Sequence, residues 1–160
     1  MCIAIYKPEG LVLKRDTLHR CWKNNPHGAG FAFIDEERVS IRKGFFTFEK
    51  FLEGFDAHKG KSVVLHFRYA TKGIRKSKKN CHPFRLSETE VVIHNGTIHH
   101  FPDHDDSDTR RFVYSYLKPF HDQNPEALWT DEGKNLLSMC IGQRPDKSPA
   151  RMVMLRADGS

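Results

Sequence analysis

Cys2 is the residue in this sequence best suited to covalent chemistry. Because cysteine is small, we expect a methionine aminopeptidase to remove Met1, so that the mature chain begins with a thiol and a free α-amine on one residue. The α-amine has an unperturbed pKa of about 7.7–8.0, close to working pH, and can act as the general base for its own thiol. On its own, a cysteine at position 2 is weak evidence, because small residues are common there for other reasons.

Several short segments further along the chain also carry residues suited to a reactive site. In chain order they read NPHGAGFA (25–32), HFRYATKG (66–73), CHPF (81–84), VIHNGTI (92–98) and DSDT (106–109). Behind an N-terminal cysteine, this series resembles the glutaminase domain of class II glutamine amidotransferases, the N-terminal nucleophile type. The resemblance covers residues 2–108, about two thirds of the chain. Each segment is short, and their common order carries the resemblance.

The resemblance implies that the chain hydrolyses the side-chain amide of L-glutamine. The Cys2 sulfur would attack the amide carbon, ammonia would leave, and water would hydrolyse the γ-glutamyl thioester. The tetrahedral oxyanion needs preorganised hydrogen-bond donors, and the resemblance gives this role to the Asn95 side-chain amide and the Gly96 N–H. No cofactor is implied for this half-reaction.

Glutamine is a zwitterion at its other end, so its recognition needs both a cation and an anion. Arg68 matches the family position that binds the α-carboxylate, where its planar fork can donate twice. Thr71 would add a hydroxyl donor to the same carboxylate, and Asp108 matches the position that holds the α-ammonium.

Each of these residues also has a simpler interpretation. Taken without its context, Asn95-Gly96 is more typical of a type I′ hairpin turn. Arg68 would usually be a surface arginine. Asp108 is also typical of a helix N-terminus, where the macrodipole stabilises a negative charge, and the two roles are compatible.

The resemblance also implies an Ntn-hydrolase fold, an α+β architecture with two antiparallel sheets sandwiched between helical layers (αββα). We expect residues 1–160 to form a single glutamine amidotransferase type 2 domain. Relatives continue with further strands, so a naturally small domain and a truncated one both stay open. No segment resembles an acceptor domain, and we therefore expect the ammonia to pass to an unidentified acceptor on a separate synthase chain.

Three positions depart from the family pattern. Ile3 stands where glycine usually follows the nucleophile, and His27 stands where aspartate is common. Lys72 replaces the histidine or similar residue that often follows the Ala-Thr pair. Two other functions therefore stay open: cleavage of a different amide by the same Cys2 machinery, and a non-catalytic basic binding module that retains Met1.

The chain carries a formal charge of +6, and part of the excess lies in the basic run from Lys72 to Lys79. By resemblance, this run belongs to a mobile loop that covers bound glutamine. A solvated loop explains its charge most simply. An anionic acceptor, a nucleic acid or an acidic synthase partner is the functional alternative. The run has no interleaved aromatic residues, which gives nucleic-acid binding little support.

Histidines and aspartates gather in the second half of the chain, and such residues could bind a metal ion. These residues are His94, His99, His100, His104, His121, Asp103, Asp105 and Asp106. They are good ligands by type, but they form no HExxH or comparable spacing, so we expect no metal. We expect His82 to be structural, because the residue before a proline is held extended.

The composition favours a soluble globular protein, with 38% hydrophobic and 11% aromatic residues. No apolar run approaches the ~20 residues of a membrane helix, and the N-terminus lacks the features of a signal peptide. We therefore expect a cytoplasmic protein. The four cysteines at 2, 21, 81 and 140 are scattered, and reduced thiols are expected.

Hydrophobic periodicity predicts the elements that position these residues. Strands are expected over 3–6, 28–34, 39–41, 62–67, 90–94 and 151–155, with a hairpin turn at 35–37. Helices are expected over 14–24, after Thr47, after Ser107 or Asp108, and after Thr130. We expect the third helix to place Phe112, Val113, Tyr116, Leu117 and Phe120 on one side, and the fourth to turn Leu136, Leu137 and Cys140 inward. This order fits an α/β or α+β domain.

Overall fold

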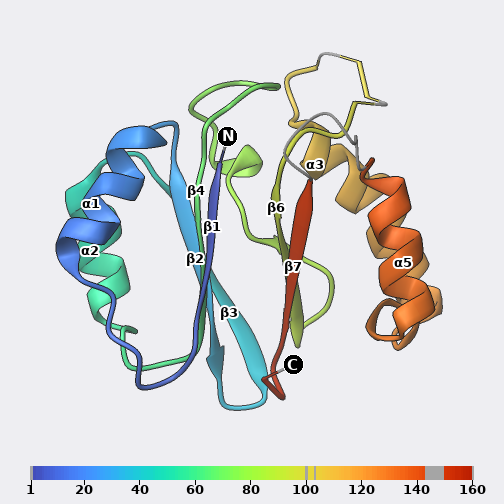
Figure 1. The fold of residues 1–160 in the computed structure, drawn as a ribbon, viewed down its shortest axis with the longest axis horizontal. Helices are drawn as coiled ribbons and strands as arrows, with labels where there is room; N and C mark the ends of the chain where they lie inside the picture. Colours follow the sequence, from blue (N-terminus) through green and yellow to red (C-terminus); the bar gives the residue numbers. More distant parts are fainter. Residues whose placement is uncertain (1, 100, 103, 143–149, 160) are drawn as a thin grey trace.

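Two antiparallel sheets face each other at the centre of the molecule, and helices cover the outer face of each sheet (Figure 1). The computed structural model describes residues 2–99, 101–102, 104–142 and 150–159. The layers follow the order helices, sheet, sheet, helices. The predicted α+β class with two antiparallel sheets is confirmed.

The larger sheet has the strand order β1-β4-β2-β3, and the smaller sheet has the order β5-β6-β7. The strands are β1 (Ile3–Lys7), β2 (Ala29–Asp35), β3 (Arg38–Phe45), β4 (Val63–Phe67), β5 (Phe84–Arg85), β6 (Glu90–Asn95) and β7 (Arg151–Arg156). β4 lies between β1 and β2, and all of its residues are buried. Its nearly continuous apolar sequence follows from this burial on both faces.

The helices lie in two groups on opposite sides of the sheets (Figure 1). α1 (Arg15–Asn24) and α2 (Phe48–Asp56) cover the larger sheet. The other group contains α3 (Asp108–Phe112), the π-helical turn η2 (Val113–Leu117), α4 (Lys118–Gln123) and α5 (Asp131–Cys140). Short 3-10 turns are η1 (Lys78–Asn80) and η3 (Ala127–Trp129).

Three predicted helix starts are confirmed by side-chain caps. In each case a hydroxyl oxygen accepts a hydrogen bond from the backbone N–H three residues further on. The capping residues are Thr47, Ser107 and Thr130. Each cap satisfies one of the N–H groups that a helix leaves unpaired in its first turn.

The apolar core is divided into three clusters, one at each interface between neighbouring layers. Phe31, Phe51 and Phe67 belong to the cluster between α1, α2 and the larger sheet. Ala32, Val64, Val91 and Ile93 belong to the cluster between the two sheets. Phe84, Val92, Val113 and Leu137 belong to the cluster between the smaller sheet and its helices. Consecutive strand residues thus contribute to different interfaces, as the period of two requires.

The third strand is longer than the sequence pattern predicts. It was expected over residues 39–41, but β3 extends from Arg38 to Phe45. The register with β2 shifts at Ala29 and Gly30, because Gly44 is an extra residue with a φ of 85°. This β-bulge breaks the regular alternation of side chains, which hides the second half of the strand from the sequence pattern.

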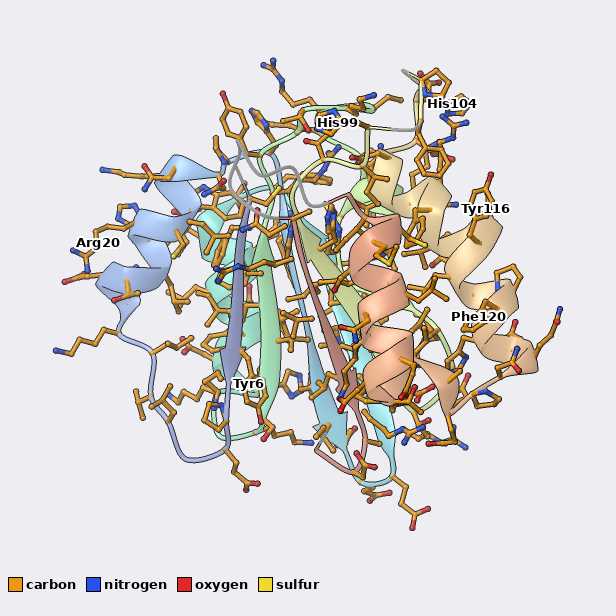
Figure 2. All side chains as sticks on the ribbon, turned by 45° about the vertical axis from the view of Figure 1, so that its right-hand side comes forward. Tyr6, Arg20, His99, His104, Tyr116 and Phe120 are labelled. Carbon is orange, nitrogen blue, oxygen red and sulfur yellow. The ribbon has the colours of Figure 1, made fainter. Side chains whose placement is uncertain are left out.

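Two side chains that were expected to face inward, Leu136 and Cys140, are exposed, so that part of the prediction is wrong; the set expected on one side of the third helix includes two exposed residues, Tyr116 and Phe120. Tyr116 is 60% exposed, Leu136 is 52% exposed and Phe120 is 38% exposed, and Cys140 is exposed as well. Figure 2 shows Tyr116 and Phe120 on the helix beside α5. The π-helical turn changes the angular spacing of the third helix, and two adjacent leucines on α5 cannot both face the core.

These exposed side chains line a surface groove of about 350 Å³ between the last helices.

Within the described ranges, no helix has the length and apolar character needed to cross a membrane.

Candidate active site

Cys2 lies directly before β1, beside the residues that follow β4. Ile3 is the partner of Phe67 in the antiparallel pair of β1 and β4, so Cys2 comes next to the continuation of β4. The Tyr69 N–H donates a hydrogen bond to Cys2 Sγ at 3.3 Å, and the thiol donates to the Tyr69 carbonyl oxygen at 3.5 Å. The predicted removal of Met1 concerns a residue outside the described part of the chain.

Five of the six predicted site residues line one small cavity. They are Cys2, Arg68, Thr71, Gly96 and Asp108. Asn95, the sixth, lies next to Gly96 but does not line this cavity. The cavity has a volume of about 20 Å³, enough for about one water molecule. Small-molecule sites usually measure roughly 300–1,000 Å³, so the cavity is too small for such a ligand in this structure.

Asn95 and Gly96 lie where β6 ends. Asn95 is the last residue of β6 and pairs with Arg151 of β7. The chain after Gly96 does not return as a neighbouring strand, since the neighbours of β6 are β5 and β7. The interpretation as a type I′ hairpin turn is therefore wrong.

Position 96 requires glycine for two reasons. Its φ is 147°, which other residues rarely adopt. A Cβ atom there would lie 2.9 Å from the Cα of Ala150 and 3.2 Å from Nε2 of His94. Glycine therefore allows this segment to pack directly against Ala150 and His94. The Oδ1 of Asn95 is buried and has no hydrogen-bond partner among the residues described.

Arg68 is buried and holds the loop that follows it. Only 3% of the residue is exposed, so the interpretation as a surface arginine is wrong. Its Nη1 donates to the carbonyl oxygens of Ile74 at 3.0 Å and Arg75 at 2.7 Å, and its Nη2 donates to that of Lys72 at 2.9 Å. A guanidinium has five N–H groups, so two remain that could bind a carboxylate.

Asp108 is the first residue of α3 and is buried. Its Oδ2 accepts a hydrogen bond from the Ile98 N–H at 2.6 Å, and its Oδ1 accepts one from the Thr109 N–H at 2.7 Å. Asp108 thus occupies a helix N-terminus, as one interpretation of the sequence predicted, and also joins α3 to the segment after β6. A carboxylate has about four acceptor positions, which leaves capacity for an ammonium group.

Thr71 is exposed at the edge of the same cavity. Its hydroxyl lies 3.3 Å from the hydroxyl of Thr97, and either group can be the donor. Because Thr97 follows Gly96 directly, this contact connects the loop after β4 with the loop after β6. The two loops that contain the predicted site residues are therefore in direct contact.

The environment of Cys2 keeps its thiol protonated. Burial raises the pKa of the Cys2 thiol, while the hydrogen bond from the Tyr69 backbone and the charge of Arg68 act in the opposite direction. Burial is the largest of these effects. A nucleophilic role for this thiol therefore needs a base, since the thiolate is the reactive form.

Three buried histidines lie next to the cavity and had been given no catalytic or binding role from the sequence. The ring centroids of His66 and His82 are 3.9 Å apart, and Nε2 of His66 lies 3.0 Å from the His94 carbonyl oxygen. Nδ1 of His94 lies 2.9 Å from the hydroxyl of Thr109. His82, His94 and Thr109 line the cavity, as do Tyr69, Ala70, Lys72 and Ser107.

All three imidazoles are neutral at physiological pH. Burial lowers the pKa of His66 to about 3 and that of His94 to about 4, and it lowers the pKa of His82 well below its usual range. The strand pattern in the sequence indicates on which face of the sheet two of these histidines lie. Strand alternation places His66 on the same face as Val64, toward the other sheet, and His94 on the same face as Val92, toward the helices.

Two of the positions that depart from the family pattern hold the loop after β4 in place. Nδ1 of His27 accepts a hydrogen bond from the Ala70 N–H at 2.9 Å, and its ring lies 4.9 Å from that of Tyr69. Lys72 Nζ donates to the Phe101 carbonyl oxygen at 2.6 Å. Both residues therefore have structural contacts at the mouth of the cavity.

Most of the basic run is exposed, as expected of a solvated loop. Arg75, Lys76, Lys78 and Lys79 are exposed, and Lys79 forms a salt bridge of 2.6 Å with Asp106. Arg68 and Lys72 attach the first part of the loop to the site.

The histidines weighed as metal ligands are distributed over separate elements. His94 belongs to β6 and His121 to α4, while Figure 2 shows His99 and His104 at the top of the molecule. Among the residues with described positions, no group of three or more His, Cys, Asp or Glu side chains is arranged to hold a metal. His100 and Asp103 lie outside the described residues.

No known protein family matches this chain, and no curated protein matches it either. Function is therefore inferred from the residues and geometry of the cavity around Cys2.

Proposed function

We propose that this chain hydrolyses the side-chain amide of L-glutamine to glutamate and ammonia through a γ-glutamyl thioester on Cys2. One observation carries this proposal: Cys2, Gly96, the buried Arg68 and the buried Asp108 come from separate parts of the chain and line one cavity. The proposal includes assignment of the four-layer architecture to the Ntn-hydrolase fold.

The chemistry needs a free α-amine on Cys2, and hence the removal of Met1. This amine takes the thiol proton as the sulfur attacks the amide carbon, and the proton then passes to the leaving nitrogen, which departs as ammonia. Water adds to the thioester, releases glutamate and restores the thiol. The Gly96 N–H and the Asn95 side-chain amide stabilise the two tetrahedral oxyanions, and loss of one such donor typically costs ~10²–10³ in rate.

The two charged residues of the cavity select the substrate. Arg68 retains two N–H groups for the α-carboxylate, and Asp108 retains acceptor capacity for the α-ammonium. Thr71 adds a hydroxyl beside Arg68. The cavity is too small for glutamine, and the proposal therefore includes an outward movement of the loop after β4 when substrate enters. The released ammonia is used by an acceptor on a separate synthase chain, and we place both proteins in the cytoplasm.

The decisive experiment measures glutamate and ammonia released from L-glutamine by protein whose intact mass shows that Met1 is absent. We expect turnover that Cys2→Ala abolishes and that Cys140→Ala, at an exposed cysteine on α5, leaves unchanged. Analogues that lack either the α-amine or the α-carboxylate should be poor substrates and weak competitors. A preference for such an analogue would instead indicate a different amide hydrolase.

Absence of turnover, together with absence of Cys2 labelling by an electrophilic glutamine analogue, would contradict the proposal. That result would favour a non-catalytic binding module.

A further inference from the structure

The two charged residues proposed to bind glutamine come from different layers of the fold. Arg68 directly follows β4 of the larger sheet, and its backbone N–H donates to the Gly28 carbonyl oxygen at 2.8 Å. Asp108 is the first residue of α3, which belongs to the helices beside the smaller sheet (Figure 1). A binding site must hold such groups to within about 0.5 Å of their productive geometry. Recognition of an α-amino acid therefore depends on what fixes α3 relative to the larger sheet.

Asn80 holds the backbone directly before Asp108. It is the last residue of η1, and it is fully buried. Its Oδ1 accepts a hydrogen bond from the Ser107 N–H at 3.0 Å, and its Nδ2 donates to the Asp105 carbonyl oxygen at 2.8 Å. Ser107 is the N-cap of α3 and directly precedes Asp108. One side chain thus fixes the segment that enters α3 at two points.

The turn η1 is attached to the larger sheet. Lys43 of β3 donates from Nζ to the carbonyl oxygen of Cys81, the residue after Asn80, at 2.9 Å. Lys78 packs directly on the backbone at the β3 bulge, because a Cβ atom at Gly44 would lie 2.6 Å from Cγ of Lys78. Contacts at both ends of η1 therefore join it to β3, and Asn80 connects the larger sheet to α3.

Asn80 also contacts the loop that surrounds the Arg68 guanidinium. Its Nδ2 lies 3.5 Å from the Ile74 carbonyl oxygen, and Nη1 of Arg68 donates to the same oxygen at 3.0 Å. The Ile74 N–H in turn donates to the Asp105 carbonyl oxygen at 2.9 Å, which Asn80 also binds. The loop after β4 and the segment before α3 are therefore joined through the oxygen atoms that Asn80 contacts.

The junction around Asn80 is closely packed. Gly73 has a φ of 74°, and a Cβ atom there would lie 2.8 Å from the Ser107 backbone nitrogen and 3.0 Å from Nδ2 of Asn80. Only glycine fits between these groups without displacing one of them. Because packed interiors transmit strain, a change on one side of the junction moves the other side.

We propose that Asn80 is a positioning residue: it sets the separation between Arg68 and Asp108 and thereby makes the site selective for α-amino acids. The proposal rests on the glutaminase function and adds a determinant of its specificity. Asn80 does not line the cavity around Cys2, so it acts through the backbone groups that it holds and not by touching substrate. A residue that only stabilised the fold would leave the preference between two ligands unchanged.

Calorimetric titration of the full chain tests this role in the Cys2→Ala background, where glutamine binds without turnover. The two ligands are L-glutamine and its isomer β-glutamine, in which the ammonium is attached to the carbon next to the α-carbon. We expect the Kd for L-glutamine to be at least about tenfold lower than that for β-glutamine, a difference of about 1.4 kcal/mol.

Asn80→Asp changes the junction with little change in side-chain size. The aspartate keeps an oxygen for the Ser107 N–H but cannot donate to the carbonyl oxygens of Asp105 and Ile74. We expect L-glutamine to bind several-fold more weakly, and its preference over β-glutamine to fall below about threefold.

Two further variants separate the geometry of the site from its stability. Gly73→Ala disturbs the same junction from the other side and removes no hydrogen-bonding side chain, and it should lower the preference as well. Asn124→Asp makes the matched change at an exposed position after α4 and should keep the parental preference. Partial unfolding of a variant raises both Kd values by the same factor, so their ratio reports the geometry of the site.

A parental ratio in Asn80→Asp, or in Gly73→Ala if the aspartate variant does not fold, overturns the positioning role and leaves the glutaminase proposal intact. Equal binding of the two ligands by the Cys2→Ala chain also overturns it, because the site then has no selectivity for Asn80 to set. If the Cys2→Ala chain binds neither ligand, the glutaminase proposal itself is contradicted, and the positioning role with it.

Discussion

Nδ1 of His94 and the hydroxyl of Thr109 lie 2.9 Å apart and join the end of β6 to the first turn of α3. The Thr109 hydroxyl also lies 3.4 Å from Oδ1 of Asp108, and Nε2 of His94 faces the backbone at Gly96. One buried contact therefore connects the residue proposed to bind the α-ammonium with the residue proposed to stabilise the oxyanion.

The first prediction concerns this contact. Thr109→Val keeps the volume but removes the hydroxyl, so the Asp108 carboxylate loses a neighbour that orients it. We expect the KM for glutamine to rise by roughly three- to tenfold, with a smaller change in kcat. Steady-state kinetics measure both, and Thr109→Ser, which keeps the hydroxyl, should restore the KM. Equal effects of the valine and serine variants would contradict this role.

A second prediction concerns the backbone at Gly96. Gly96→Ala places a methyl group against Ala150 in a conformation that alanine rarely adopts, so we expect a loss of about 1–3 kcal/mol in the free energy of unfolding. Chemical denaturation measures this loss. Gly60→Ala is the control, because nothing lies within 4 Å of its added Cβ atom. Similar stability of the two variants would show that position 96 is not constrained.

The same Gly96→Ala substitution moves the N–H proposed to stabilise the oxyanion. Glutaminase activity should therefore fall by at least about 10²-fold under conditions where the variant remains folded. Near-normal activity would remove Gly96 from the proposed oxyanion site.

A third prediction concerns stability in acid. The folded chain holds His66 and His94 neutral, with pKa values of about 3 and about 4, whereas an unfolded histidine titrates near pH 6.5. Below pH ~6.5 the unfolded chain therefore binds more protons than the folded chain. Each of these histidines should lower the free energy of unfolding by ~1.4 kcal/mol per pH unit until its folded pKa is reached.

Urea denaturation between pH 7 and pH 4 measures this slope. Removing one buried titrating group by His94→Asn should make the dependence on pH shallower, even if the variant is less stable at every pH. His19→Asn, at an exposed position on α1, should leave the slope unchanged. The prediction is wrong if both variants keep the parental slope.

A fourth prediction concerns Glu90, which is buried and joins the smaller sheet to its helices. Its Oε1 accepts hydrogen bonds from Trp129 Nε1 at 2.7 Å and Arg156 Nε at 2.9 Å, and its Oε2 contacts His121. Burial alone would raise the pKa of Glu90, but these and other hydrogen bonds outweigh it and lower the pKa. Glu90→Gln should cost about 1–2 kcal/mol, because the hydrogen bonds from Trp129 and Arg156 lose a charged, buried acceptor while Arg156 keeps its contacts with Glu126.

Thermal or chemical unfolding of Glu90→Gln checks this cost. Glu37→Gln, in the exposed turn between β2 and β3, should change stability by less than about 0.5 kcal/mol. Equal stability of the two variants would show that the buried network contributes little.

The sequence predicts much of this fold because its strands and caps have local signals. β4 is a continuous apolar run, and the caps at Thr47, Ser107 and Thr130 precede helical periodicity. β5 was missed because two residues are too few for a pattern, and the end of β3 was missed because Gly44 breaks the alternation. The π-helical turn has no comparable local signature, so the sequence pattern does not reveal that Tyr116 and Phe120 are exposed.

The sequence also predicts which residues meet, but less of what each one contacts. The family resemblance groups Arg68 and Gly96 with Cys2, and in the structure all three line one cavity. The bonds from Arg68 to three loop carbonyls depend on the path of the loop, and they cannot be derived from spacing. The stacking of His66 on His82 likewise requires two distant segments to meet in three dimensions.

The three hydrogen bonds from Arg68 to loop carbonyl oxygens also affect how fast a protease cleaves the segment after β4. The segment they restrain, residues 72–75, contains two trypsin cleavage sites, at Lys72 and Arg75. A protease needs an extended, locally open segment, so cleavage there reports the population of molecules in which the loop has left the arginine. Digestion rate at this loop is thus a readout of site opening that requires neither turnover nor a known ammonia acceptor.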